Sequence, residues 1–196
     1  MSTETVDPVE TGYVRLGRSD PVMNGLIQEL GTPDPFAFPD GGRTSGNNFA
    51  GMVLHIVAQQ ISIRVALVLY DRLDAALGGA PTPTGILALD LDELRAIGMS
   101  HSKAAYLHNL ANAVVAGDLA IDTLEEVHDD DAIAALTRVK GIGPWSAEMF
   151  LIHQVRRLDV LPAGDLGIRT GVHRVYALPD LPLLDEVRRR GTVWSP

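Results

Sequence analysis

The chain has 196 residues, of which 46% are hydrophobic and 21% charged, and its formal net charge is −9 at pH 7. This length and composition are typical of a globular protein of one or two small domains, with enough chain to close a hydrophobic core. The absence of cysteine excludes disulfides, thiolate zinc sites and cysteine-ligated iron–sulfur clusters, and it favours a cytoplasmic location. No apolar run approaches the ~20 residues of a membrane span, so we expect no membrane partner.

The charges are unevenly distributed along the chain. Residues 1–137 hold 7 Lys or Arg and 19 Asp or Glu, whereas residues 138–196 hold 9 and 6. The C-terminal part is therefore basic on an acidic body, which hints at a local anion-facing surface. The 6 histidines form no ligand-like cluster in the sequence, so we expect no protein-ligated catalytic metal.

The first elements are set by polar, proline and glycine signals. Residues 1–17 are polar, and we expect a flexible or loosely docked N-terminus there. Asp20, followed by proline, has the pattern of an N-cap and predicts a helix that runs to Leu30 and ends at Gly31. Residues 31–46 are rich in Gly, Pro and Asp and predict a loop.

Helical periodicity dominates the rest of the chain. No sustained apolar–polar alternation occurs, so the sequence predicts an all-α fold. Between the first two apolar stripes stand Gln59 and Gln60, and Ser62 is a candidate N-cap for the second stripe; the pattern alone favours a solvated joint between two helices. The three stripes are Phe49, Met52, Val53, Ile56 and Val57; Val65, Val68, Leu69 and Leu73; and Ala104, Leu107, Ala111, Val114 and Val115.

A glycine hairpin is predicted at residues 136–150, which have the pattern of a helix, a tight turn and a second helix. Gly141 and Gly143 permit positive φ angles and close approach of a ligand, and Pro144 suits the first turn of a helix. We expect Ile142 between them to plug into the core. Backbone N–H groups at such a turn, with the helix dipole behind them, make an anion site suited to a phosphate.

The glycines alone leave a second interpretation open, because a glycine-terminated helix followed by a new helix is common. The basic residues Arg138 and Lys140 beside the turn shift the interpretation toward contact with a DNA or RNA backbone.

The hairpin and the segment after it carry a resemblance to a known family. Val-Lys-Gly-Ile-Gly-Pro-Trp-Ser-Ala at 139–147, followed by Leu-Asp-Val-Leu-Pro-Ala-Gly-Asp-Leu-Gly-Ile-Arg at 158–169, resembles the helix-hairpin-helix (HhH-GPD) DNA glycosylases, and among them the alkylated-base (3-methyladenine) type. Residues 56–62 and 97–106 also match. The resemblance implies a compact helical domain over residues 18–196, with two lobes and a cleft between them. Relatives continue past the Trp-x-Pro element into a further helix, so we expect a truncated C-terminal helix.

The resemblance implies that Asp165, about twenty residues past the hairpin, is the catalytic carboxylate. The local pattern by itself favours a helix N-cap, and the two roles are compatible because N–H donors at a helix start keep a carboxylate ionised. An aligned carboxylate stabilises the oxocarbenium-like state of N-glycosidic bond cleavage and can orient the attacking water. A methylated purine is already cationic and leaves without protonation, so one acid is enough.

Trp145 lies where bifunctional relatives carry a Schiff-base lysine, so the resemblance implies base release without strand cleavage. Trp145 and Met149 are candidates for the base pocket, where an indole can attract a cationic purine; a core tryptophan is the alternative. Gln60, with Gln59 beside it, matches the position that fills the gap left by the extruded nucleotide. The candidates for DNA-backbone contacts are Lys140, Gly141, Gly143, Ser100 and Lys103.

The sequence therefore predicts a monofunctional DNA-3-methyladenine glycosylase of base excision repair. Its expected partner is double-stranded DNA with alkylated bases, with no obligate protein partner. No cofactor is expected, and a monovalent cation at the hairpin is the one ion left open. Two alternatives remain: a non-catalytic module that binds the DNA backbone only, and a strand-cleaving glycosylase with Lys140 as its amine.

Overall fold

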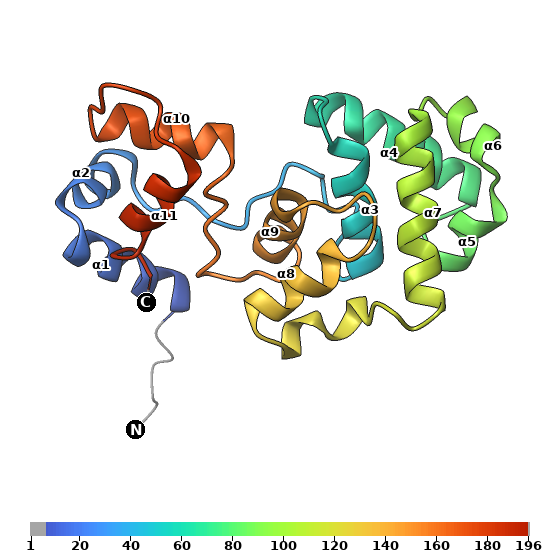
Figure 1. Cartoon of the computed structure of the whole chain (residues 1–196), viewed down its shortest axis with the longest axis horizontal. Helices are drawn as coiled ribbons and strands as arrows, with labels where there is room; N and C mark the ends of the chain where they lie inside the picture. Colours follow the sequence, from blue (N-terminus) through green and yellow to red (C-terminus); the bar gives the residue numbers. More distant parts are fainter. Residues whose placement is uncertain (1–6, 196) are drawn as a thin grey trace. The chain divides into compact units, whose positions relative to one another are not determined.

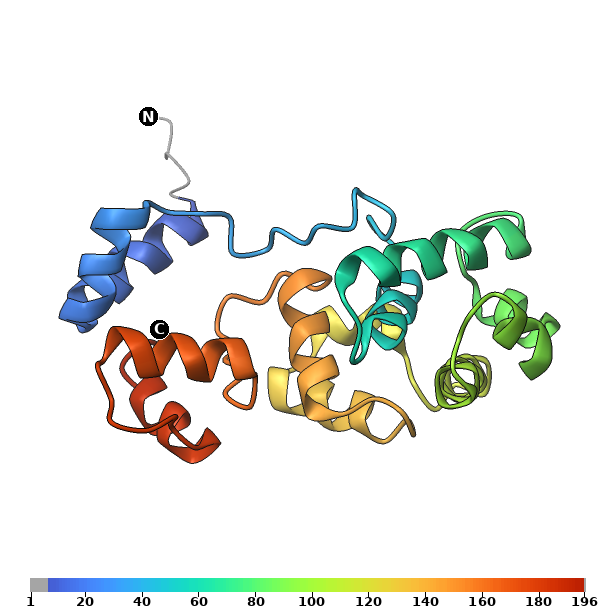
Figure 2. The ribbon, with the colours of Figure 1, turned by 90° about the horizontal axis from the view of Figure 1, so that it is seen from above.

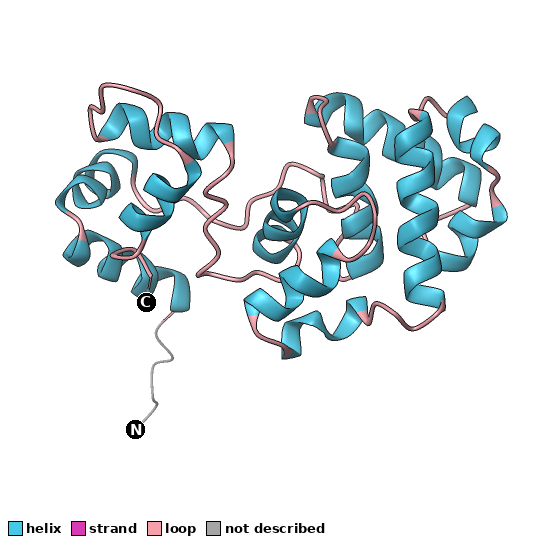
Figure 3. Cartoon of the chain, viewed as in Figure 1, coloured by secondary structure: helices cyan, strands magenta, loops and turns pink. Residues whose placement is uncertain are grey.

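The computed structural model describes residues 7–195, and every regular element in that range is a helix (Figure 1 and Figure 3). The all-α prediction is confirmed. Within the same range, no helix is long and apolar enough to cross a membrane.

The chain folds as two compact units. Unit 1 combines the two ends of the chain, up to Ala37 and from Arg157 onward, and unit 2 spans Phe38–Arg156. The blue and red ends of the ribbon accordingly lie in one unit in Figure 1. Unit 1 contains α1 (Pro8–Ser19), α2 (Pro21–Leu30), α10 (Leu166–Val175) and α11 (Leu184–Gly191). Unit 2 contains α3 (Asn48–Ala58), α4 (Ile63–Leu77), α5 (Pro83–Ala88), α6 (Leu91–Ala96), α7 (His101–Val115), the 3₁₀-helix η1 (Ile121–Glu126), α8 (Asp129–Thr137) and α9 (Pro144–His153).

The N-terminal expectation needs a correction. Asp7 caps α1 by accepting a hydrogen bond from Val9 N, and α1 packs against α2. The expectation of a flexible or loosely docked segment 1–17 missed this helix: residues 8–17 are helical because a capping aspartate and a first-turn proline start α1, although none of its residues is buried. Residues 1–6 lie outside the described part of the chain.

Asp20 fastens α2 to the other end of the chain within unit 1. Its carboxylate caps α2 by accepting from Val22 N at 2.8 Å, and it also accepts from Trp194 Nε1 at 2.9 Å and from the Tyr176 hydroxyl. Burial raises the pKa of Asp20, but the hydrogen bonds from Trp194 and Tyr176 and from the backbone outweigh burial, and the pKa lies below its ordinary value. The predicted helix from Asp20 to Leu30, ending at Gly31, is confirmed.

Helix α3 forms the centre of unit 2. All its residues from Phe49 to Val57 are buried, and it packs against α4, α7, α9 and η1. A helix that is apolar on nearly every side is stable only inside a core. The first predicted stripe is buried as expected, but burial extends to the other faces of the helix, which the stripe did not predict. Helix α7 carries the short helices α5 and α6 on its side, as Figure 2 shows in a view nearly along its axis.

The second predicted stripe is only half right: two of its four residues are buried, and the other two are exposed. Leu69 and Leu73 of α4 are buried, but Val65 and Val68 are 49% and 47% exposed. The buried face of α4 instead includes Ala66 and Tyr70, because the helix packs on α3 along a row one residue further around the axis. The third stripe is buried through Ala111 and becomes exposed at its end, where Val115 is 57% exposed.

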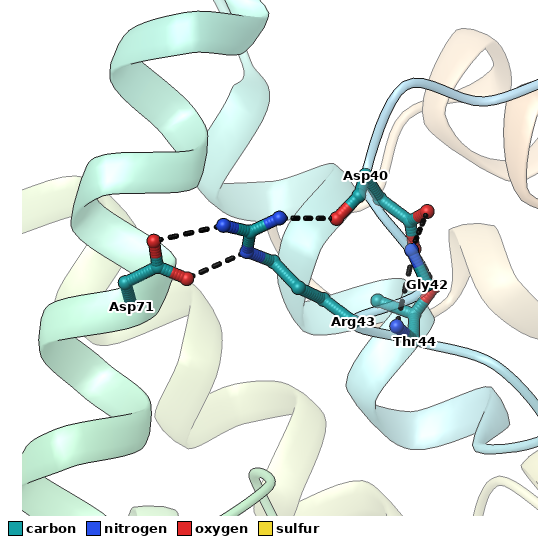
Figure 4. Close-up of polar contacts among 5 residues, drawn as sticks. All are labelled: Asp40, Gly42, Arg43, Thr44 and Asp71. Atoms are coloured by element: carbon teal, nitrogen blue, oxygen red, sulfur yellow. Dashed lines mark hydrogen bonds and ion pairs between the residues drawn. The ribbon is translucent and has the colours of Figure 1, made fainter.

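The loop predicted at residues 31–46 is confirmed, and polar contacts hold it at the start of α3 (Figure 4). The buried Asp40 carboxylate accepts from Gly42 N at 2.9 Å and from Thr44 Oγ1 at 2.7 Å. Arg43 reaches α4 and donates to both carboxylate oxygens of Asp71, at 2.6 and 3.0 Å. A bidentate pair of this kind fixes orientation as well as distance, so it holds the loop against α4.

Candidate nucleic-acid interface and candidate carboxylate

The glycine hairpin forms as predicted in unit 2. Helix α8 ends at Thr137, and α9 begins at Pro144 with Gly143 as its N-cap. Ile142 is 4% exposed and plugs into the core of unit 2. No side chain caps α9, so its first-turn N–H groups receive no capping hydrogen bond from a side chain.

Gly141 is required by both its conformation and its neighbour. Its φ of +112° is a value that other residues rarely adopt. A Cβ built on Gly141 would lie 2.2 Å from Cγ of Tyr106, the α7 side chain that packs over the turn. Gly143 has neither restriction, because its φ is −91° and nothing lies within 4 Å of an added Cβ.

Two side-chain amides hold the carbonyl groups of the hairpin. Gln59 Nε2, at the end of α3, donates to the Gly141 carbonyl at 2.8 Å and to Ser146 Oγ at 3.1 Å. Asn109 Nδ2 of α7 donates to the Lys140 carbonyl at 2.9 Å. Sequence reasoning placed Gln59 only beside the nucleotide gap and missed this contact, because its partner lies 82 residues further along the chain.

A surface hollow of about 490 Å³ brings together many of the predicted DNA-contacting residues of unit 2. Its lining includes both glycines of the hairpin, both glutamines of the turn after α3, and Trp145. Met149 lies one turn further along α9 and is half-buried, and Lys140 is exposed on the hairpin. The full lining is Gln59, Gln60, Tyr106, Gly141, Ile142, Gly143, Pro144, Trp145 and Ser146.

The aromatic candidate Trp145 and the amide candidate Gln60 both lie at the surface of unit 2. Trp145 is 38% exposed, so it is not a core tryptophan of unit 2. Gln60 is exposed and has a φ of +58°, left-handed for a residue that is not glycine. A left-handed residue of this kind stores about 1 kcal/mol or more of strain, and such strain clusters at functional sites. Ser62, the predicted cap, starts α4 directly after this turn.

The two candidates at the start of α7 have structural roles in addition to any contact with DNA. Ser100 caps α7 by accepting from Lys103 N at 3.2 Å. The Lys103 ammonium donates to the Val57 carbonyl near the end of α3 at 2.7 Å, and burial lowers its pKa. A cation near a helix C-terminus interacts favourably with the helix dipole. Lys103 therefore links α7 to the end of α3, directly before Gln59 and Gln60.

The candidate carboxylate lies in the other compact unit. Asp165 is the N-cap of α10, and its Oδ1 accepts from Ile168 N at 2.9 Å. The preceding residues Pro162 and Ala163 are buried, and Ala163 belongs to the core of unit 1 with Val172 of α10. Buried residues just before Asp165, and Val172 two turns into α10, therefore fix the segment that carries the carboxylate, and the predicted N-cap at Asp165 is confirmed.

The histidines and the hairpin carbonyl groups of unit 2 are the candidates for binding a cation. The described residues contain no group of three or more His, Asp or Glu side chains that could hold a metal ion. His55 and His153 stack on the ring of Phe38, and burial, followed by the charge of His153, lowers the pKa of His55 to about 3. At the hairpin, the Gly141 and Lys140 carbonyls keep a second lone pair beside their amide donors, which is compatible with the monovalent cation that remains a prediction.

Residues 53–196 match the family described as HhH-GPD superfamily base excision DNA repair protein. The chain therefore belongs to this family.

Individual relatives agree with the family. The chain is 32% identical over 148 residues to DNA-3-methyladenine glycosylase 1 of Schizosaccharomyces pombe, an alignment that covers 74% of this chain and 65% of the relative. It is also similar to the structure of an S. pombe 3-methyladenine DNA glycosylase in complex with abasic DNA, with a TM-score of 0.81, 27% identity and coverage of 95% and 90% of the two chains. A DNA-3-methyladenine glycosidase from Bacillus halodurans gives a TM-score of 0.81, 30% identity and coverage of 100% and 87%. The chain spans between about half and two thirds of the length of the curated relatives that match first.

Proposed function

We propose that this protein is a monofunctional DNA glycosylase that releases alkylated, cationic purines such as 3-methyladenine and 7-methylguanine from double-stranded DNA. The observation that carries the proposal is the Asp165 carboxylate, held by a backbone N–H at the start of α10, in a chain of the HhH-GPD family. Relatives named as 3-methyladenine glycosylases support the substrate class.

The hairpin is the proposed DNA-backbone contact. The first-turn N–H groups of α9 have no side-chain cap, and the exposed Lys140 adds a positive charge beside them. An uncapped helix N-terminus with a nearby cation is suited to a phosphate, which positions the duplex without reading its sequence. Gln60, at the exposed and strained turn after α3, is the proposed residue that occupies the gap left by the extruded nucleotide.

The proposed chemistry needs one carboxylate. As the bond between C1′ and the base nitrogen breaks, positive charge develops on the deoxyribose, and the Asp165 carboxylate stabilises it. The electron pair of that bond neutralises the cationic base, a water molecule adds to C1′, and Asp165 orients this water or accepts its proton. The products are the free base and an abasic site.

The absence of an amine at position 145 supports base release without strand cleavage. Trp145 cannot attack C1′, and an indole at the surface can attract a cationic purine. The one lysine of the hairpin, Lys140, is the amine through which a strand-cleaving alternative would act.

The test uses duplex DNA methylated at purine nitrogens, incubated with the wild-type chain and with Asp165→Asn. We expect chromatography to show free 3-methyladenine or 7-methylguanine with the wild type, and at least a 100-fold slower release with the variant. Borohydride trapping is expected to give no covalent adduct. Release that does not depend on Asp165 would overturn the proposed chemistry, and DNA binding without any release would favour the non-catalytic module.

A further inference from the structure

Gly167 lies in the first turn of α10, two residues after Asp165. The backbone does not require glycine there, because Gly167 is absent from the positive-φ residues of the described chain. A glycine inside a helix costs about 0.5–1 kcal/mol relative to alanine. The position therefore gives up helix stability without a conformational reason.

The space beside Gly167 is used by the carboxylate. A Cβ built on Gly167 would lie 2.9 Å from Oδ1 of Asp165, whereas ordinary van der Waals contacts begin at 3.4 Å. This Oδ1 is the atom that accepts from Ile168 N at 2.9 Å. A methyl group at position 167 would thus displace the oxygen that the helix start holds in place.

We propose that Gly167 is a positioning residue for Asp165: the missing side chain lets Oδ1 occupy its place over the first turn of α10. The inference rests on the proposed function, because it concerns the carboxylate of that reaction. The atom that must yield is the end of a flexible side chain rather than backbone, so the fold tolerates the change while the carboxylate moves. Misplacement of a reacting group by about 1 Å costs about 100-fold in rate.

The same helix supplies a matched control. Gly171 is one turn further along α10, and nothing lies within 4 Å of a Cβ built there. Both variants replace a glycine of α10 by alanine, but only Gly167→Ala places a Cβ against Asp165. The gain in helix propensity is the smaller one at position 167, because it lies in the first turn. Each variant is compared for thermal stability, affinity for a methylated duplex, and single-turnover release of base with enzyme in excess.

We expect Gly171→Ala to match the wild type in all three, apart from a small gain in stability. Gly167→Ala is expected to keep its fold and its DNA affinity, with at most a small fall in melting temperature because the cap of α10 is disturbed, and to release base about 10- to 100-fold more slowly. In an Asp165→Asn background, Gly167→Ala should have no further effect, because the group that it displaces is already inactive.

A release rate for Gly167→Ala within twofold of Gly171→Ala would overturn the inference, and so would a further loss in the Asp165→Asn background. A fall in melting temperature of more than about 8 °C, or a loss of DNA affinity together with the rate, would assign Gly167 a structural role instead. If Asp165→Asn itself released base at the wild-type rate, the proposed function would fail, and the two failures are therefore distinguishable.

Discussion

The N-termini of α9 and α10 differ in whether a side chain accepts hydrogen bonds from their first backbone N–H groups. Helix α9 starts at Gly143, which offers no side chain, whereas α10 starts at Asp165, which supplies its own carboxylate. The start of α9 therefore has no side-chain cap and is called the open N-terminus below, whereas the dipole and an N–H group at the start of α10 hold an internal anion. In the proposed function, the open N-terminus binds a DNA phosphate and the capped N-terminus orients the group that acts on the sugar.

Gly141→Ala has the largest expected effect on the open N-terminus. The new Cβ would meet Cγ of Tyr106 at 2.2 Å, and the existing φ of +112° would become strained for a residue with a side chain. We expect a loss of about 2–5 kcal/mol in the free energy of unfolding, together with loss of DNA binding. Denaturant unfolding measures the first and fluorescence anisotropy the second. Gly143→Ala is the matched control: its added Cβ meets nothing, and alanine is a poorer N-cap than glycine, so we expect a loss of at most about 1 kcal/mol. Equal stability of the two variants would contradict this account of the turn.

Asp20→Asn tests an N-cap aspartate of unit 1 that serves stability alone. Asparagine still caps α2 but loses the charge that accepts from Trp194 and Tyr176, so we expect a loss of about 1–3 kcal/mol at neutral pH. Because the pKa of Asp20 is lowered in the fold, its contribution is present above the ordinary carboxylate pKa and is lost as the pH falls through the lowered value.

The stability of Asp20→Asn should therefore depend less on pH in the acid range than that of the wild type, as measured by denaturant unfolding at several pH values. Asp7→Asn, at the exposed cap of α1, is the control and should change little. A wild-type acid profile in Asp20→Asn would contradict the assignment.

Gly143→Asp converts the open N-terminus of α9 into a capped one like that of α10. The side chain should stabilise the helix start by about 0.5–1 kcal/mol, while its charge competes with the phosphate and weakens DNA binding about tenfold at low salt. Gly143→Asn has the same shape without the charge, so the difference between the two variants isolates electrostatic competition. Unchanged affinity in Gly143→Asp would remove the hairpin from the DNA interface.

Gln59→Leu has the smallest expected effect. It removes the amide that bonds to the Gly141 carbonyl and Ser146 Oγ, and we expect a loss of about 1 kcal/mol in unfolding free energy. Gln60→Leu, one residue away at an exposed position, should leave stability unchanged and instead slow base release. If Gln60→Leu lowered stability and Gln59→Leu slowed base release instead, Gln60 would be the structural residue and Gln59 the one that acts on DNA.

Most of the local structure was predictable from the sequence, because its signals are local. Asp20 and Gly31 delimit α2, Gly141 and Gly143 delimit the hairpin, and Asp165 caps α10. Burial and long-range partners were not predictable to the same degree. Val65 fits the helical period as well as Ala66 does, and only the packing of α4 on α3 decides which of them is buried.

The candidate site shows the same division. The hollow beside the hairpin gathers Gln60, Trp145 and the two glycines that the sequence singled out. The contact of Gln59 with Gly141 and the space that Gly167 leaves for Asp165 depend on three-dimensional placement, which no spacing rule encodes.

The most direct test measures DNA affinity and single-turnover base release side by side for Asp165→Asn and Gly143→Asp on the same methylated duplex. If the open helix start binds DNA and the capped one carries the chemistry, Asp165→Asn keeps its affinity and loses release. Gly143→Asp then loses affinity but releases base at nearly the wild-type rate once enzyme is saturating. If both variants lost affinity, or both lost release at saturating enzyme, the claim that one helix start binds DNA and the other acts in the reaction would be contradicted.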